Sequence, residues 1–146
     1  MSESNTMESM RAWLRTCPAI IQTLRFGVDY LRENAGEYAL YAAPSTIAMR
    51  ENVLGEEVPQ QTQQLNFTFA SREPFGADSQ RNAQNLAFFT AVTEWILQQN
   101  AEKNFPEITE GRVRSIVPTL TGYAADASDD TATYQIQIRL IYRRTT

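Results

Sequence analysis

The chain has 146 residues, of which 42% are apolar and 21% charged, values typical of a soluble protein with one domain-sized core. It contains no histidine, which excludes an imidazole general base, a Ser-His-Asp or Cys-His pair and any histidine-containing metal site within one chain. The net charge of −4 makes nucleic acid a poor default partner, because phosphate binding draws on clustered cations.

The cations are unevenly distributed and are almost all arginine. Residues 1–111 hold 8 basic and 14 acidic side chains, whereas residues 112–146 hold 5 and 3. Arginine suits fixed, bidentate contacts between surfaces better than lysine does. An acidic body with a mildly basic C-terminal part is compatible with head-to-tail association of copies, and equally with an ordinary solvated surface.

Cysteine usage and the N-terminus bear on the compartment. The single cysteine, Cys17, cannot form an intrachain disulfide, so a reducing compartment is the simpler expectation. The first residues are polar and acidic, unlike a secretory signal, and no run approaches the roughly 18 apolar residues of a membrane span. We expect a soluble, intracellularly made protein.

Apolar residues at helical spacing predict a short amphipathic helix from Asn5 to Cys17. Asn5 is positioned to cap it, with Glu8 at the third helical position, and Pro18 supplies a stop. With no histidine to activate its thiol, Cys17 is predicted to be buried and unreactive. The predicted buried stripe consists of Met10, Trp13, Leu14 and Cys17.

Two-residue alternation of apolar and polar side chains predicts several strands. A turn is expected at 33–36 and a hairpin tip at 54–56, and Pro44 should end the second strand. The last of these strands has the strongest pattern, with Leu, Phe and Phe at alternate positions. In chain order the predicted extended segments are 24–30, 38–42, 46–52 and 58–71.

Residues 71–76 are predicted to break the last of these strands and lead into a helix over about 78–102. Asp78 or Ser79 can cap the helix start. Its wide apolar stripe is typical of a helix laid across a sheet, and a ligand pocket is the alternative. The stripe consists of Leu86, Phe88, Phe89, Val92, Trp95 and Ile96.

The C-terminal third is predicted to be a long hairpin. Its first strand covers 112–124, where Pro118 indicates a bend or an edge position, and 125–130 form an acidic tip. The second strand, 131–144, buries one face and keeps the other polar over more than the usual strand length. That polar face is either solvated or turned to a neighbour, and an exposed Ile141 beside Arg139 and Arg143 favours contact.

The order of elements lacks strand–helix–strand alternation and predicts an α+β fold in a single domain, 1–146. We expect one mainly antiparallel sheet, with the 78–102 helix and the N-terminal helix packed on one face, and the long hairpin at the C-terminus.

No catalytic, cofactor-binding or metal-binding motif is present. The six glycines form no phosphate-binding pattern. The acidic segment 126–130 lacks the glycine and the distal glutamate of a calcium loop, so a solvated tip is favoured. Neighbouring carboxylates occur at 56–57 and 129–130, both at predicted turns where acidities stay ordinary. A small enzyme that uses converging carboxylates remains an alternative, but we expect no enzyme and no cofactor.

Several segments resemble small virion proteins of tailed phages and prophages of Gram-positive bacteria. They share packing patterns rather than catalytic motifs. The similar segments are 10–18 (MRAWLRTCP), 67–76 (FTFASREPFG), 94–96 (EWI) and 134–142 (YQIQIRLIY).

Within that group the layout is similar to the tail terminator, or tail completion, proteins. The resemblance implies a sheet backed by helices that assembles into a hexameric ring in the virion neck after synthesis in the host cytoplasm. The ring would cap the head-proximal end of the tail tube, stop its polymerisation and present a surface to the head–tail connector. The implied partners are other copies, the tail tube protein and connector or stopper proteins, with no membrane and no sequence-specific nucleic acid. A connector or stopper subunit is the alternative.

In that role, interface residues are expected at the strand-to-helix break, at the acidic tip and on the last strand. Phe75 has an equally good local role as an anchor of the helix start, and a solvated strand is the plainer interpretation of the two arginines. The candidates are Arg72, Glu73, Phe75, Asp126, Asp129, Asp130, Arg139, Ile141 and Arg143.

Overall fold

The computed structural model describes residues 3–20, 26–28, 37–74, 79–127 and 131–144. The fold is α+β, with a mixed five-stranded sheet, two helices and a separate two-stranded sheet. In chain order the elements are α1 (Glu3–Leu14), β1 (Phe26–Val28), β2 (Glu37–Ala43), β3 (Met49–Glu51), β4 (Glu57–Pro59), β5 (Thr62–Pro74), α2 (Ser79–Glu102), β6 (Gly111–Ala127) and β7 (Thr131–Arg144).

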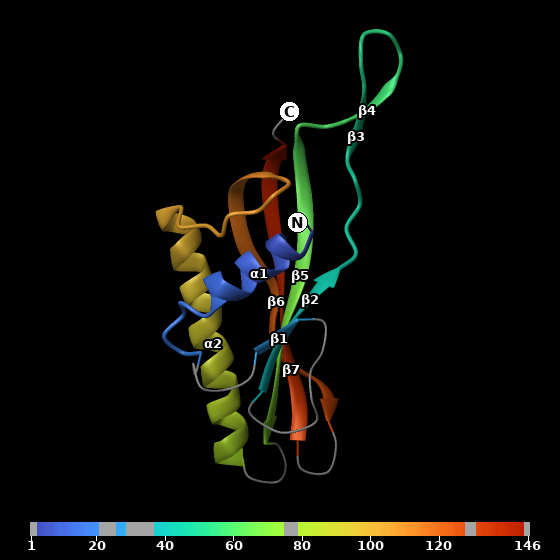
Figure 1. Cartoon of the computed structure of the whole chain (residues 1–146). Coiled ribbons are helices and arrows are strands. Elements are labelled where there is room, and N and C mark those ends of the chain that lie inside the picture. Colours follow the sequence, from blue (N-terminus) through green and yellow to red (C-terminus); the bar gives the residue numbers. More distant parts are fainter. Residues whose placement is uncertain (1–2, 21–25, 29–36, 75–78, 128–130, 145–146) are drawn as a thin grey trace.

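The large sheet has the strand order β1-β2-β5-β7-β6. Three of its four pairings are antiparallel, which confirms the predicted mainly antiparallel sheet, and β1 pairs with β2 in parallel. Both helices lie on the same side of this sheet (Figure 1). The two long strands β5 and β7 lie side by side through thirteen paired residues. They are the centre of the sheet, and β6 is its edge, as Pro118 indicated.

The core lies between the sheet and the helices. Phe69 of β5 is fully buried, with its ring centroid 5.6 Å from that of Phe26, 5.7 Å from Tyr38 and 6.2 Å from Phe89 of α2. These separations are typical of favourable aromatic pairs. The predicted stripe of the first helix is buried as expected, including Cys17. Phe88 of α2 also stacks on Tyr38 of β2, and Phe89 stacks on Tyr134 of β7, so aromatic contacts tie α2 to β2, β5 and β7.

The boundaries of α1 differ from the prediction. The helix already includes Asn5, which therefore is not its N-cap, and it ends at Leu14 in a turn that runs to Ile20. Two hydrogen bonds hold this turn: the Cys17 amide donates to the Leu14 carbonyl at 3.0 Å, and the Ile20 amide donates to the Cys17 carbonyl at 3.1 Å. Cys17 reaches the core from this turn rather than from the helix.

The predicted strand 58–71 is two strands, and the predicted break after it is wrong. β4 ends at Pro59 and β5 begins at Thr62. β5 then continues through Arg72 and Glu73 to Pro74, which pairs with Thr131 of β7. The described pairing of β5 with β2 ends at Arg72, so the proline, which has no N–H to donate, occurs where one side of the strand has no partner among the described residues.

Leu86 was predicted to join the buried stripe of α2 but is 49% exposed. At 100° per residue it lies about 90° around the helix from the centre of the buried stripe formed by Phe89, Val92 and Ile96. The predicted helical spacing is confirmed, but the buried stripe of α2 is narrower than the set of apolar residues predicted for it. Phe88 and Trp95 lie at its margins, partly buried.

Substitution of Phe89 by alanine should lower the free energy of unfolding by about 3–5 kcal/mol, because a fully buried aromatic side chain leaves a cavity between α2 and the sheet. Leu86→Ala on the same helix is the matched control and should change it by less than about 0.5 kcal/mol. Urea denaturation followed by circular dichroism measures both. Equal losses for the two variants would contradict this packing of α2.

Candidate functional site

The two faces of β7 differ sharply, as its alternation predicted. Ile136, Ile138 and Leu140 are buried against the helices, whereas Gln137, Arg139 and Arg143 are exposed on the opposite face. Ile141 was predicted to be exposed but is half-buried. It sits between Gln64 of β5 and Ser115 of β6 in the sheet register, so neighbouring strands cover part of it.

Two arginines lie directly opposite each other on this outer face. Arg112 of β6 pairs in register with Arg143 of β7, and both are exposed. Like charges placed opposite one another in antiparallel strands are destabilising. Within the part of the chain that the structure describes, neither makes an ion pair. This end of the sheet therefore carries positive charge that no carboxylate among the described residues pairs with.

The charge continues along the sheet with Arg139, which is opposite Asn66 of β5 and Val117 of β6. We call the outward side chains of Arg112, Arg139 and Arg143 the arginine face. Their described neighbours on the same face contribute amides, hydroxyls and aliphatic groups but no carboxylate; they are Thr62, Gln64, Asn66, Ser115, Val117, Gln137 and Ile141. On a chain of net charge −4, such a face suits an anionic partner surface.

A groove of about 400 Å³ opens on the arginine face between the end of β2 and β7. Ala43 and Pro44 form one side, and Gln137 and Arg139 the other. Across its floor the Asn66 side-chain amide donates to the carbonyl of Pro44 at 2.9 Å. The groove offers hydrogen-bond donors and a guanidinium, which are groups that bind carboxylates or backbone carbonyls.

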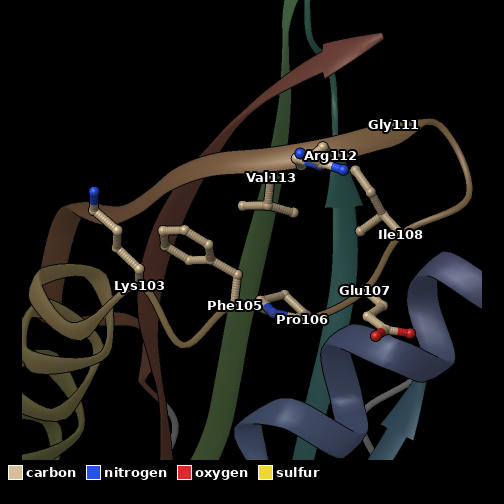
Figure 2. A pocket seen from close by; sticks show the side chains of 8 residues that line it. All are labelled: Lys103, Phe105, Pro106, Glu107, Ile108, Gly111, Arg112 and Val113. Carbon is tan, nitrogen blue, oxygen red and sulfur yellow. The ribbon is translucent and has the colours of Figure 1, made fainter. Parts of the chain in front are cut away.

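A second pocket, of about 460 Å³, lies at the start of β6 (Figure 2). Phe105, Ile108 and Val113 give it apolar walls, with Val113 pointing from the strand into the space. Lys103 and Arg112 add positive charge to the lining, and Glu107 adds a carboxylate. An apolar side chain flanked by carboxylates would complement this lining.

The connection that forms this pocket is anchored to the body of the protein. Lys103 ends α2 in the left-handed conformation (φ 59°), a common helix termination. The indole of Trp13 donates to the Asn104 carbonyl at 2.9 Å. Thr6 of α1 donates to the Glu110 carboxylate at 2.7 Å. The pocket wall is therefore held by α1 as well as by the sheet.

Residues 44–61 form a projecting arm, built from the hairpin of β3 and β4. Figure 1 shows it extending past the end of the sheet where the C-terminus lies. Among the described elements, β3 and β4 contact only each other. At the base, buried Gln63 accepts from the Ala48 amide at 2.9 Å and donates to the Ala48 carbonyl at 2.8 Å. The arm is held by these hydrogen bonds where it leaves the sheet, and beyond that point its strands contact no other described element.

The tip of the arm is an ordered turn with exposed apolar side chains. Asn52 Oδ1 accepts from the amides of Leu54 (2.9 Å) and Glu56 (3.0 Å). Gly55 takes φ 82°, a conformation that suits glycine in a turn. This confirms the predicted hairpin tip at 54–56. Val53 is fully exposed and Leu54 is 78% exposed, so the turn holds two apolar groups in water.

The arm also carries a pair of like charges, of opposite sign to the arginine pair. Glu51 of β3 lies directly opposite Glu57 of β4, and both are exposed. Because side chains alternate between faces, Arg50, opposite Val58, lies on the other face of the hairpin. The acidic face of the arm therefore has no cation of its own among these paired residues.

The interface candidates predicted from sequence are brought together only in part. Arg139, Ile141 and Arg143 share the arginine face. Arg72 and Glu73 lie in β5, and Asp126 in β6 opposite Thr133. Phe75, Asp129 and Asp130, with the predicted turn 33–36, lie outside the described residues.

Sequence reasoning missed Arg112 and the functional interest of the arm. Arg112 was assigned only to a strand, and its place opposite Arg143 depends on the register of β6 and β7. The arm did leave a signal, because Leu54 is an apolar residue in the predicted tip 54–56 and Val53, directly before it, is apolar too. Turns normally favour polar residues and glycine.

Within the described residues, no group of three or more histidine, cysteine or carboxylate side chains could hold a metal ion. Neither helix in this part of the chain combines the length and the apolar character needed to cross a membrane. Neither a scan against models of known protein families nor a search among curated proteins gives a match.

The Cys17 thiol should react slowly with a disulfide reagent such as DTNB in the folded protein. It is buried, and burial raises the pKa of the thiol, so little thiolate is present near neutral pH. Reaction then requires opening of the structure and should become fast in urea. Fast stoichiometric reaction of the folded protein near pH 7 would contradict this placement.

Substitution of Gly111 by alanine should destabilise the start of β6. A Cβ there would lie 2.2 Å from the Arg143 carbonyl oxygen and 2.9 Å from a ring carbon of Tyr142. We expect a loss of about 1–3 kcal/mol, as for other overpacked sites, in urea denaturation. Arg114→Ala, at an exposed position of the same strand, is the control with little effect. Full stability of Gly111→Ala would rule out the close approach of β6 and β7.

Proposed function

We propose that the protein is a tail terminator (tail completion) subunit of a tailed phage or prophage. Copies would form a ring, expected to be a hexamer, that caps the head-proximal end of the tail tube, ends its polymerisation and presents a surface to connector or stopper proteins. The proposal places the protein in the virion neck, with the tail tube protein as a partner, and gives it no enzymatic activity and no cofactor.

One observation carries the proposal: the chain presents two unlike and complementary surfaces, the acidic arm with its apolar tip and the arginine face. A ring requires heterologous contacts, in which one surface of a subunit meets a different surface of the next. Complementary charge on those surfaces selects the register of the contact and disfavours wrong pairings. The resemblance of residues 10–18 and 67–76 to virion proteins supports the same assignment.

In this proposal β6 and β7 provide the sheet face that meets a neighbouring subunit or the ring lumen. We infer that the two strands form one long hairpin, with both helices covering one sheet face as a rigid backing. The opposite face then remains open for a neighbouring subunit or the ring lumen, and Arg139 and Arg143 lie on it.

A head–tail connector or stopper subunit is the second candidate, because a ring at that station needs the same two kinds of surface. The two differ in partner, which makes them separable by genetics. Of the two, we expect the terminator, which contacts the tail tube at the head–tail junction.

Deletion of the gene from the phage or prophage that encodes it tests the function. Loss of a terminator leaves tube polymerisation unchecked, so electron microscopy of lysates should show tails longer than those of the parent, beside full heads. Complementation with the intact gene is the control and should restore tail length. Normal-length tails beside tail-free capsids would instead identify a connector, and unchanged virions would contradict both assignments.

A further inference from the structure

We propose that the arm of one copy docks on the end of the sheet of a second copy, with Glu51 and Glu57 facing Arg112 and Arg143. The inference deepens the proposed function, since it names the contact between subunits, but it rests on surfaces that can be tested without any phage.

The two charged pairs are opposite in sign and alike in spacing. Glu51 and Glu57 are directly opposite residues of an antiparallel pair, and so are Arg112 and Arg143. Directly opposite residues have Cα atoms about 4.5–5.5 Å apart in any antiparallel ladder. Each pair alone is repulsive, and bringing them together turns two like-charge repulsions into attractions between carboxylates and guanidinium groups.

The tip is preorganised for such a contact. Five hydrogen bonds involving Asn52 fix the turn. The Leu54 and Glu56 amides donate to its side-chain oxygen, and its own backbone amide donates to the Glu56 carbonyl at 2.9 Å. The Gly55 amide donates to the Asn52 carbonyl at 3.0 Å, and the Asn52 side-chain amide donates to the Glu56 carboxylate at 3.1 Å. Little conformational freedom is then lost on docking, which raises affinity.

A second copy fits better than another kind of partner, because the complementary surface is present on the chain itself. Within one copy the arm does not reach Arg112 and Arg143. It leaves the sheet after β2 and extends away from the sheet, and its strands contact no other element that the structure describes (Figure 1). The acid-bearing and arginine-bearing surfaces differ, so the contact is heterologous and can close into a ring.

Two charge-reversal variants test the contact. E51R/E57R changes only the arm and R112E/R143E only the receiving end. All four side chains are exposed, so both variants should fold with wild-type circular dichroism and thermal midpoints. E94R/E102R, at exposed positions of α2, makes the same change in net charge as the arm variant and is its matched control. Arg50→Glu probes the other face of the arm.

Sedimentation velocity and native mass spectrometry of each protein over a concentration series give the result. Wild type, E94R/E102R and Arg50→Glu should have similar association constants. E51R/E57R and R112E/R143E should each lower the association constant by about tenfold or more. Mixing the two reversal variants should restore association, since every junction then pairs opposite charges. Association of either reversal variant at wild-type strength, or failure of the mixture to recover it, would overturn the proposal.

Cross-linking gives a position-specific measurement. A mixture of Glu57→Cys and Arg143→Cys proteins should form a heterodimer under oxidising conditions, whereas a mixture of Glu102→Cys and Arg143→Cys should not. A wild-type protein that stays monomeric at high concentration, together with no specific cross-link, would overturn the inference.

The outcomes also separate this inference from the proposed function. A wild-type ring that persists in both reversal variants overturns the arm contact and leaves the terminator assignment standing. Association through the arm into dimers or open chains supports the arm contact and counts against a ring terminator.

Discussion

The burial of one face of β7 between the helices and the neighbouring strands determines the rest of the structure. Ile136, Ile138 and Leu140 are held in the core, and the two-residue period of a strand then puts Arg139 and Arg143 on the other face. A slip of one residue would exchange the two faces. Because β7 is paired on both sides, with β5 and with β6, its register also places Arg112 opposite Arg143.

Period and composition were sufficient to predict much of the fold. The α+β class, the mainly antiparallel sheet, the buried stripe of the first helix and the hairpin tip at 54–56 follow from local patterns and agree with the structure. Local patterns failed where a distant partner decides the outcome. β5 continues to Pro74 because β7 pairs with it there, and the parallel pairing of β1 and β2 involves segments that no local signal connects.

The same limit applies to the candidate site. Arg139 and Arg143 could be chosen from the sequence because they alternate with apolar residues along one strand. Arg112 could not, since its importance arises from the bulged pairing of β6 with β7. Ile141 has the polar-face position that alternation predicts, but cross-strand neighbours reduce its exposure. The arm carboxylates become informative only once Glu51 is known to lie opposite Glu57.

The central claim is that the uncompensated charges of the arm and of the arginine face meet between copies. A cryo-electron microscopy structure of the assembled protein tests this most directly. We expect density for the arm of each copy on the sheet end of the next, with Glu51 and Glu57 carboxylates within about 4 Å of Arg112 and Arg143 guanidinium nitrogens, the usual range of an ion pair. Arms that project into solvent, or that pack on another surface while Arg112 and Arg143 remain uncovered, would contradict it.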